Sequence, residues 1–286
     1  MIDVAVYKSK VKPDWCPGCG DYAVLNALQK ALAELDLDPK DVLVVSGIGC
    51  SSNLPGFINA YGFHSLHGRS LPVATGAKLA NHALNVIVTG GDGDGFGIGL
   101  GHFIHTARRN VDMTYIVMDN QVYGLTTGQA SPTTMKGIAT KSTPTGTIET
   151  PVNPIAQALI SGATFVGRGF SGENLHLAEL MKAAIKHHGF SLVDVMSPCV
   201  TYNKHNTYPW FRERVYKLED KQHDATDYNA AMTRAHEDWN QSIPIGCFYK
   251  VDRPTYEDEE PALANGPLIK QPLVPKGVDA IIKGLY

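Results

Sequence analysis

The sequence Leu84-Asn85-Val86-Ile87-Val88-Thr89-Gly90-Gly91-Asp92-Gly93-Asp94-Gly95 decides the fold that we expect. Its apolar first part, Leu84 to Val88, is typical of a buried strand. Its glycine-rich, acidic second part is typical of the turn in which such a strand ends. Asp92 is therefore expected at the C-terminal end of a strand, where side chains can meet a ligand.

A second strand is predicted beside the first. After a segment of helical character, roughly Ile98 to Arg109, the apolar run Thr114 to Met118 ends just before Asn120. This order predicts a βαβ unit, whose right-handed crossover brings Asp92 and Asn120 to one carboxyl edge of a parallel sheet. A carboxylate and an amide oxygen suit Mg²⁺ shared with a diphosphate, and glycines let backbone N–H groups approach phosphate oxygens. An acidic turn without a metal is the alternative.

The composition limits the class of protein. The chain has 286 residues, 43 % hydrophobic and 19 % charged, so it can bury a sizeable core in one large domain or two small ones. Its formal net charge of −3 argues against nucleic-acid binding. No apolar run approaches the ~20 residues of a membrane span, and the first residues lack the apolar part of a secretory signal. We therefore expect a cytoplasmic protein without membrane contact.

Cysteine usage points to metal or redox chemistry. Five cysteines in a chain of this length give no disulfide framework. Cys16 and Cys19 flank Pro17-Gly18, a tight turn that points both sulfurs at a common centre. Such a pair suits zinc, an iron–sulfur cluster or a redox disulfide, and the spacing alone leaves these alternatives open.

Two further cysteines follow predicted strands. Cys50 comes after the apolar run Val42 to Val45, and Cys199 comes after the predicted strand Ser191 to Met196. Both are expected at the carboxyl edge of the sheet, although a lone cysteine is more often a small core residue. Cys247 has no comparable position, and we expect it to pack in the core.

The combination of these residues resembles a known family. Cys16, Cys19, Cys50 and Cys199, together with Asp92 and Asn120, are closely similar to the pattern in the β subunit of 2-oxoacid:ferredoxin oxidoreductases. Further matching stretches are Gly47-Ile48-Gly49-Cys50-Ser51-Ser52, His64-Ser65-Leu66-His67-Gly68-Arg69 and Asn120-Gln121-Val122-Tyr123-Gly124-Leu125-Thr126-Thr127-Gly128-Gln129. The resemblance runs from about Trp15 to Cys199 and continues more weakly to about Tyr256. It implies an α/β thiamine diphosphate-binding fold with a mostly parallel sheet, helices on both faces and an extended C-terminal arm.

The resemblance also implies roles for individual residues. The four matching cysteines, Cys16, Cys19, Cys50 and Cys199, would hold one [4Fe–4S] cluster. Mg²⁺ would be held by the side chains of Asp92 and Asn120 and by the backbone carbonyl of Val122. Residues expected around thiamine diphosphate are Ile48, Gly49, Cys50, Ser51, His64, His67, Gly68, Gly91, Gly93, Asp94, Tyr123, Gly124 and Leu125.

His64, His67 and Arg69 are the candidate catalytic or substrate-orienting residues. Histidines in a glycine-bounded loop can bind diphosphate or steer a substrate carboxylate, or can simply satisfy backbone groups. Arg69 is either a carboxylate anchor or part of a structural ion pair. We find no domain that would supply the glutamate with which thiamine enzymes activate the cofactor. The resemblance therefore implies a partner α subunit, in a dimer of heterodimers.

The implied reaction is the reversible, coenzyme A-dependent oxidative decarboxylation of a 2-oxoacid, with electrons passed to ferredoxin. The stretches Ser52-Asn53-Leu54-Pro55-Gly56-Phe57 and Tyr61-Gly62-Phe63-His64 look most like members that use 2-oxoglutarate. Asn53 departs from the Lys or Arg that relatives often have there, so pyruvate or another 2-oxoacid is an alternative substrate. A non-redox thiamine lyase or synthase and an electron-transfer iron–sulfur subunit are the other functions considered.

Three regions are predicted along the chain: 1–200 binds thiamine diphosphate and the cluster, 201–252 is a C-terminal helical extension of the same domain, and 253–286 is a proline-rich arm. The arm is either solvated or laid on a partner subunit. Residues Thr126 to Asn153 lack apolar periodicity and are predicted to form a loop over the active site or against a partner. Further helices are predicted near Tyr22 to Leu35, Asn153 to Leu159, Asn174 to His187 and Tyr228 to Trp239, and a strand near Thr164 to Gly167.

Overall fold

A computed structural model describes residues 2–272 and 277–285, so the predicted arm lies partly outside the described residues. The strands are β1 (Val42–Ser46), β2 (Tyr61–His64), β3 (Asn85–Gly91), β4 (Met113–Asp119), β5 (Val122–Tyr123), β6 (Gln129–Ala130), β7 (Phe165–Phe170), β8 (Phe190–Met196), β9 (Val215–Lys217) and β10 (Ile243–Lys250). The α-helices are α1 (Asp21–Glu34), α2 (Leu54–Phe57), α3 (Ser70–Ala80), α4 (Asp92–Phe96), α5 (Leu100–Arg109), α6 (Pro154–Ile160), α7 (Asn174–Lys186), α8 (Tyr208–Arg212), α9 (Tyr228–Ala235), α10 (Tyr256–Glu259) and α11 (Val278–Lys283). Short 3₁₀ helices are η1 (Val4–Tyr7), η2 (Pro39–Asp41), η3 (Cys50–Asn53), η4 (Glu219–Lys221), η5 (Pro261–Leu263) and η6 (Leu268–Lys270).

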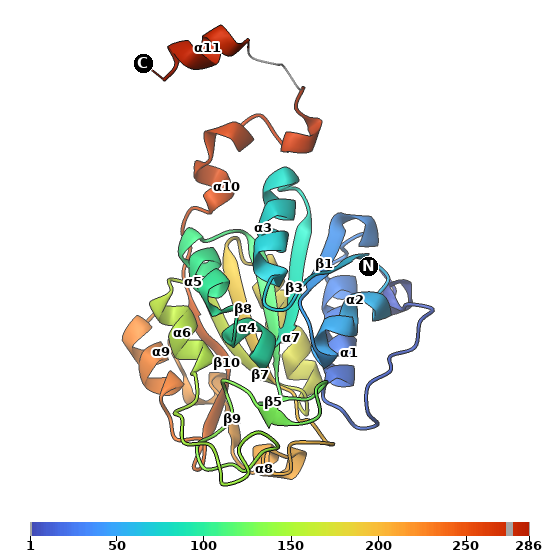
Figure 1. The fold of residues 1–286 in the computed structure, drawn as a ribbon, viewed down its shortest axis with the longest axis vertical. Coiled ribbons are helices and arrows are strands. Elements are labelled where there is room, and N and C mark those ends of the chain that lie inside the picture. The colour runs from blue at the N-terminus through green and yellow to red at the C-terminus, as the bar shows by residue number, and fades with distance from the viewer. Residues whose placement is uncertain (1, 273–276, 286) are drawn as a thin grey trace.

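The main sheet has the strand order β2-β1-β3-β4-β8-β7-β10-β9 (Figure 1). Each neighbouring pair is parallel except β7 and β10, which are antiparallel. A separate antiparallel hairpin joins β5 to β6. The mostly parallel α/β architecture is as predicted.

Helices cover both faces of the sheet because its central strands are apolar on both sides. Ile116 and Met118 of β4 belong to the core that contains residues of α1 and α7. Tyr115 and Val117, which alternate with them along the strand, belong to the core that contains residues of α5, α6 and α9. All residues of β4 are buried, as expected for a parallel strand between two helical layers.

The predicted βαβ unit is present, with β3 and β4 as parallel neighbours and Gly91 opposite Met118. The connection differs from the prediction in one respect, because the short helix α4 begins at Asp92 itself. Sequence reasoning placed Asp92 in a turn because two of the five α4 residues are glycines, which disfavour helices. Here α4 is buried throughout, and tertiary packing overrides this local preference.

The region 201–252, expected to be helical, also contributes two strands. Besides α8 and α9 it contains β9 and β10, and β10 extends the main sheet by pairing with β7. Pro244 and Gly246 interrupt the apolar pattern of β10, and its register shifts between Cys247 and Tyr249. Proline and glycine inside a run argue against a strand, so sequence reasoning missed β10.

The start of the predicted arm is attached to the domain. The side chain of Asn110 donates hydrogen bonds to the carbonyls of Arg253 (3.2 Å) and Pro254 (3.0 Å). Thr255 is buried and caps α10, and the Glu257 carboxylate accepts the backbone N–H of Asp112. After α10 the chain leads away from the sheet (Figure 1). Within the described ranges, no helix has the length and apolar character needed to cross a membrane.

Candidate active site

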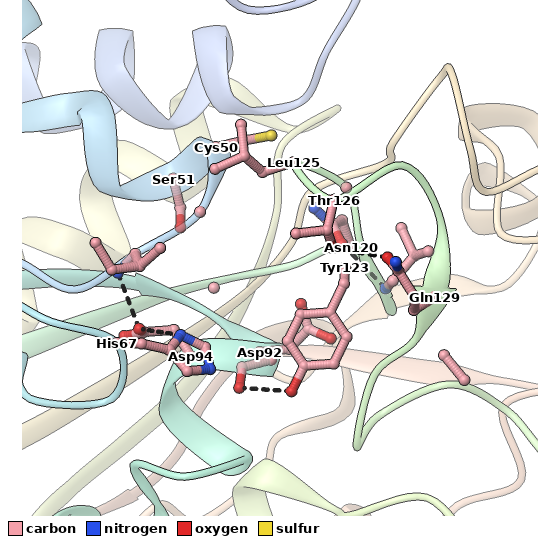
Figure 2. Close-up of a pocket in the computed structure, with 17 residues that line it drawn as sticks. Cys50, Ser51, His67, Asp92, Asp94, Asn120, Tyr123, Leu125, Thr126 and Gln129 are labelled. Atoms are coloured by element: carbon pink, nitrogen blue, oxygen red, sulfur yellow. Dashed lines mark hydrogen bonds and ion pairs between the residues drawn. The ribbon is translucent and has the colours of Figure 1, made fainter. Parts of the chain in front are cut away.

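A cavity of about 470 Å³ lies where β1, β3 and β4 end and the β5–β6 hairpin begins (Figure 2). It is lined by Ile48, Gly49, Cys50, Ser51, His67, Gly91, Asp92, Gly93, Asp94, Asn120, Val122, Tyr123, Gly124, Leu125, Thr126, Gln129 and Ala130. The structure thus brings together the three predicted Mg²⁺-binding residues and most of the residues predicted to surround thiamine diphosphate. We call this space the cofactor cavity.

Asp92 is 1 % exposed, at the start of α4. Its Oδ2 accepts a hydrogen bond from the Thr133 hydroxyl at 2.7 Å. Burial raises the pKa of Asp92 to about 6, although hydrogen bonds from the hydroxyls of Ser131 and Thr133 oppose the shift. A divalent cation beside this carboxylate would favour its charged form, which the site otherwise disfavours.

Asn120 and Val122 reach the same cavity because the chain turns sharply between them. Gln121 has a φ of 59°, in the left-handed region that non-glycine residues seldom adopt. The Asn120 side-chain oxygen accepts the Val122 backbone N–H at 3.0 Å, and this bond closes the turn. The Asn120 carbonyl accepts the Asn203 side-chain amide, also at 3.0 Å. This turn sets Asn120 and Val122 beside Asp92 as possible oxygen ligands.

Asp94 forms hydrogen bonds that hold two further segments, around Ile48 and around Gly68, at the site. Its Oδ1 accepts the backbone N–H groups of Ile48 (2.9 Å) and Gly68 (2.7 Å) and lies 3.1 Å from Nδ1 of His67, as Figure 2 shows for the histidine. Burial raises the pKa of Asp94, and these neighbours oppose the shift. A side chain at Gly47 would collide with the Asp94 carboxylate. Asp94 therefore shapes the cavity wall.

Two glycines that line the cavity differ in how closely other side chains approach them. A Cβ at Gly93 would overlap the ring of Tyr123, whose hydroxyl donates to the Gly93 carbonyl at 3.1 Å. A Cβ at Gly124 would lie 3.6 Å from the Cys50 sulfur and 3.8 Å from the Cys199 sulfur. Gly93 is therefore needed for the packing of Tyr123 beside the cavity, whereas the Gly124 position has ordinary van der Waals distances to both sulfurs.

A second cavity, of about 220 Å³, lies directly beside the first. It is lined by all four predicted cluster ligands, Cys16, Cys19, Cys50 and Cys199, and it shares Cys50, Asn120, Gly124 and Leu125 with the cofactor cavity. We call it the cysteine cavity. Burial raises the pKa of the Cys50 thiol to about 11, with Asp21 adding to the effect. Burial raises the pKa of Cys19 further.

The four thiols surround a space but do not form a site for one ion. Within residues 2–272 and 277–285, no three His, Cys, Asp or Glu side chains are placed to hold a single metal ion. A [4Fe–4S] cluster takes thiolates on separate iron atoms, so its ligands surround the cluster more widely. The donor set, four free thiols, fits such a cluster. Cys247 lies apart on β10 and packs against the core, as the sequence predicted.

Three predicted residues do not line the cofactor cavity. His64 is exposed on the edge strand β2, and Gly68 contributes only its backbone N–H to Asp94. The Arg69 guanidinium contacts Nε2 of His102, and burial together with Arg69 lowers the pKa of that histidine. Asn53 lines the cysteine cavity, where its side chain donates to Asp14 at 3.4 Å. Of the candidate catalytic residues, His67 alone lines the cofactor cavity within the described chain.

Sequence reasoning missed two residues behind Asp92. The Thr133 hydroxyl lies 2.7 Å from Asp92 and 2.9 Å from Oδ1 of Asp119. Burial, Asp92 and Asp194 raise the pKa of Asp119 well above its usual range. A hydroxyl has one hydrogen, so Thr133 donates to one carboxylate and accepts from the other in its protonated form. The only available signal was a polar Ser131-Pro132-Thr133-Thr134 stretch in a long loop.

The site lies in a region whose sequence matches thiamine diphosphate enzymes. Residues 47–195 match a family model described as the C-terminal TPP binding domain of thiamine pyrophosphate enzymes. Residues 199–265 match one described as the C-terminal part of the pyruvate ferredoxin oxidoreductase beta subunit.

Similarity to individual proteins defines the family more closely. The chain is 50 % identical over 265 residues to subunit beta of 2-oxoacid:ferredoxin oxidoreductase 1 from Aeropyrum pernix, covering 89 % of this chain and 83 % of that one. It is 37 % identical over 287 residues to the 2-oxoglutarate oxidoreductase subunit KorB from Mycobacterium tuberculosis, covering 85 % and 77 %. A solved structure of 2-oxoglutarate:ferredoxin oxidoreductase from Magnetococcus marinus, with 2-oxoglutarate, coenzyme A and succinyl-CoA bound, is 41 % identical, with a TM-score of 0.91 over 100 % of this chain and 96 % of that one. The chain belongs to the family of 2-oxoacid:ferredoxin oxidoreductase β subunits.

Proposed function

We propose that this β subunit binds thiamine diphosphate, Mg²⁺ and one [4Fe–4S] cluster, and converts 2-oxoglutarate and coenzyme A to succinyl-CoA and CO₂ while reducing ferredoxin. The observation that carries the proposal is the pair of adjacent cavities, one with oxygen ligands and glycines and the other with four thiols. Cys50 and Gly124 belong to both, so a cofactor and a cluster would be separated by little more than these residues.

The residues of the cofactor cavity suit Mg²⁺ and a diphosphate. Asp92, Asn120 and the Val122 carbonyl would hold the cation, because hard cations prefer oxygen ligands. Gly91 and Gly93 line the cavity at the start of α4, where their backbone would face the diphosphate. The buried Asp92 carboxylate, with its raised pKa, would gain a positive partner.

When bound, thiamine diphosphate supplies the carbon nucleophile for decarboxylating a 2-oxoacid, and the cluster takes up electrons one at a time. The role of this chain is to place the two groups next to each other. The Cys50 backbone is held by the Trp15 indole, which donates to its carbonyl at 2.7 Å. Trp15 packs edge-on against Phe57 and Tyr22, so its indole is held by packing as well as by this hydrogen bond.

A partner α subunit is part of the proposal. No glutamate lines the cofactor cavity among the described residues, although thiamine enzymes activate the cofactor with one. Two apolar side chains at its mouth, Ile48 and Leu125, are 37 % and 55 % exposed, which favours coverage by another chain. A dimer of heterodimers with the glutamate on the α subunit accounts for both features. A cytoplasmic location and ferredoxin as electron acceptor complete the proposal.

Pyruvate is the second candidate substrate. One matching family model is described by pyruvate ferredoxin oxidoreductase, and Asn53 offers no positive charge for a second carboxylate. Relatives and the solved structure named for 2-oxoglutarate favour the first candidate.

The test is coenzyme A-dependent reduction of a viologen dye by the complex purified without oxygen. We expect higher kcat/KM with 2-oxoglutarate than with pyruvate or 2-oxobutyrate, and thiamine, Mg²⁺ and iron bound to the complex. D92N should lose Mg²⁺ and activity, whereas D220N, which changes an exposed carboxylate in η4, should keep both. Preference for pyruvate would refute the substrate assignment, and activity without bound thiamine would refute the mechanism.

A further inference from the structure

Thr133 contacts the proposed Mg²⁺ ligand from outside the cofactor cavity. Its side chain is 3 % exposed, and its hydroxyl is hydrogen-bonded to Oδ2 of Asp92 at 2.7 Å and to Oδ1 of Asp119 at 2.9 Å. Thr133 lines a different cavity, of about 380 Å³, together with Asp119 and Gln121. The Asp92 carboxylate therefore has the cofactor cavity at one side and the Thr133 hydroxyl at the other.

The position of Thr133 is set by a tight turn, Ser131 to Thr134. The Ser131 N–H donates to the Thr134 hydroxyl at 2.8 Å, and the Thr134 N–H donates to the Ser131 carbonyl at 3.1 Å. The Thr134 hydroxyl donates to the Gln121 carbonyl at 2.7 Å. The turn is thus fastened to the residue that precedes Val122.

The hairpin gives this turn a second attachment to the site. Val122 pairs with Ala130 and Tyr123 pairs with Gln129, so the chain leaves the cofactor cavity along β5 and returns along β6. Three residues later it places Thr133 against Asp92. Two proposed Mg²⁺ ligands, Asp92 and the Val122 carbonyl, are consequently held by one short segment.

We propose that Thr133 is a positioning residue that orients the Asp92 carboxylate for Mg²⁺. This inference rests on the proposed function, because it takes Asp92 as a ligand of the cation. The hydroxyl engages one carboxylate oxygen and thereby fixes the rotation of the side chain, which leaves the rest of the carboxylate available to the cofactor cavity. Groups that hold metal ligands in this way commonly change metal affinity about 10- to 100-fold when they are removed.

The experiment uses the complex of this chain with its α subunit, stripped of Mg²⁺ by a chelator and kept without oxygen. Mg²⁺ is titrated at fixed thiamine diphosphate, and bound Mg²⁺ is measured by equilibrium dialysis. T133V, which removes the hydroxyl at nearly constant shape, should weaken Mg²⁺ binding about 10-fold or more. T133S keeps the hydroxyl and should restore binding close to that of the wild type.

T114V is the matched control. Thr114 is also 3 % exposed, but its hydroxyl donates to the Ala184 carbonyl at 3.3 Å, at the start of β4 and far along the strand from Asn120. It should leave Mg²⁺ affinity unchanged. If T133V does not assemble, T133A is compared with T133S in its place.

The D92N variant tests whether Asp92 is a Mg²⁺ ligand, independently of the role of Thr133. Weak Mg²⁺ binding in D92N together with wild-type binding in T133V or T133A would overturn the role of Thr133. Wild-type Mg²⁺ binding in D92N would instead refute Asp92 as a ligand and, with it, the proposed cofactor site. Equal weakening in T133V and T133S would also overturn the proposal, because only one of them lacks the hydroxyl.

Discussion

The carboxylate of Asp94 accepts the backbone N–H of Gly68 at a distance of 2.7 Å. The same oxygen accepts the Ile48 N–H at 2.9 Å, so α4 is tied to two loops that follow β1 and β2. Asp94 is 2 % exposed, and its bonds are therefore shielded from water. Two segments beside the cofactor cavity, at Ile48 and at Gly68, are therefore held by one buried side chain.

D94A should destabilise the protein and weaken cofactor binding. It leaves the Ile48 and Gly68 N–H groups without an acceptor, and a buried unpaired donor costs about 1–3 kcal/mol. We expect the free energy of unfolding to fall by at least that amount and the dissociation constant for thiamine diphosphate to rise. D94N retains one acceptor oxygen and should be milder. Denaturant unfolding and fluorescence titration measure the two effects, and wild-type cofactor affinity in D94A would contradict this view of the walls.

G93A should block the cofactor cavity. The new Cβ would overlap the Tyr123 ring, which would have to leave its hydrogen bond to the Gly93 carbonyl. We expect a large loss of thiamine diphosphate binding, measured by titration of the complex. G101A is the control, because an added Cβ there meets no atom within 4 Å and Gly101 lies in α5. Alanine at that helical position should stabilise the protein by about 0.5–1 kcal/mol and leave binding intact.

The strands that could be predicted from the sequence are those formed by a continuous apolar run. The runs before Asp92 and Asn120 are apolar and bounded by glycine or polar residues, and they became β3 and β4 within a few residues. β10 could not be predicted, because Pro244 and Gly246 break its pattern and its antiparallel partner in the sheet, β7, is distant in the sequence. Strand identity there is decided by tertiary contacts, which a local pattern does not contain.

In the site, too, the residues that end a strand could be predicted from the sequence, whereas contacts between distant segments could not. Asp92 and Asn120 each end a recognisable strand, so their meeting follows from topology. The contact of Thr133 with Asp92 does not follow from topology, because Thr133 is 41 positions from Asp92 and its polar loop does not indicate which residue it contacts. Arg69 likewise sits in a matching stretch, yet its guanidinium contacts His102, and no short pattern specifies that neighbour.

Loss of a single cysteine of the cysteine cavity should remove iron from the complex. C19S and C199S each take away one of the four thiols, and hydroxyl groups are poor ligands for iron–sulfur clusters. We expect the iron content and the visible absorption of the cluster to drop strongly in both. C247S, which changes the thiol on β10, should keep both properties. Equal iron content in C19S and the wild type would rule out Cys19 as a ligand.

Tyr7 should make the stability of the protein depend on alkaline pH. Its hydroxyl donates to the Leu37 carbonyl at 2.6 Å, and burial, with Asp38 and Asp41, raises its pKa from 10 to about 12. The folded state therefore keeps a proton that the unfolded chain releases. The resulting stabilisation is complete below pH 10 and is lost as the pH rises through 12, by about 3 kcal/mol in total.

Y7F tests this linkage directly. At pH 8 it should be less stable than the wild type by about 1 kcal/mol, because the hydrogen bond to Leu37 is gone. Between pH 10 and 12 the difference should shrink and then reverse, since phenylalanine has no proton to lose. Thermal unfolding of both proteins across this range measures the difference. A gap that stays constant with pH would show that Tyr7 ionises as easily in the folded protein as in the unfolded chain.

Removing Arg168 from its ion pair with Asp194 should destabilise the protein strongly, whereas replacing both residues with apolar ones should destabilise it much less. Both side chains are fully buried, with Nε of Arg168 3.0 Å from Oδ2 of Asp194, and the guanidinium lies 4.8 Å from the ring centroid of Trp239. Burial raises the pKa of Asp194 and the arginine charge opposes the shift.

R168M should lower the free energy of unfolding by about 3–5 kcal/mol, because it leaves a buried carboxylate without its partner. The double variant R168M/D194L should recover most of that loss, since two apolar side chains need no charge compensation. Denaturant unfolding of the two variants decides the point, and additive losses in the double variant would show that the two side chains stabilise the fold independently.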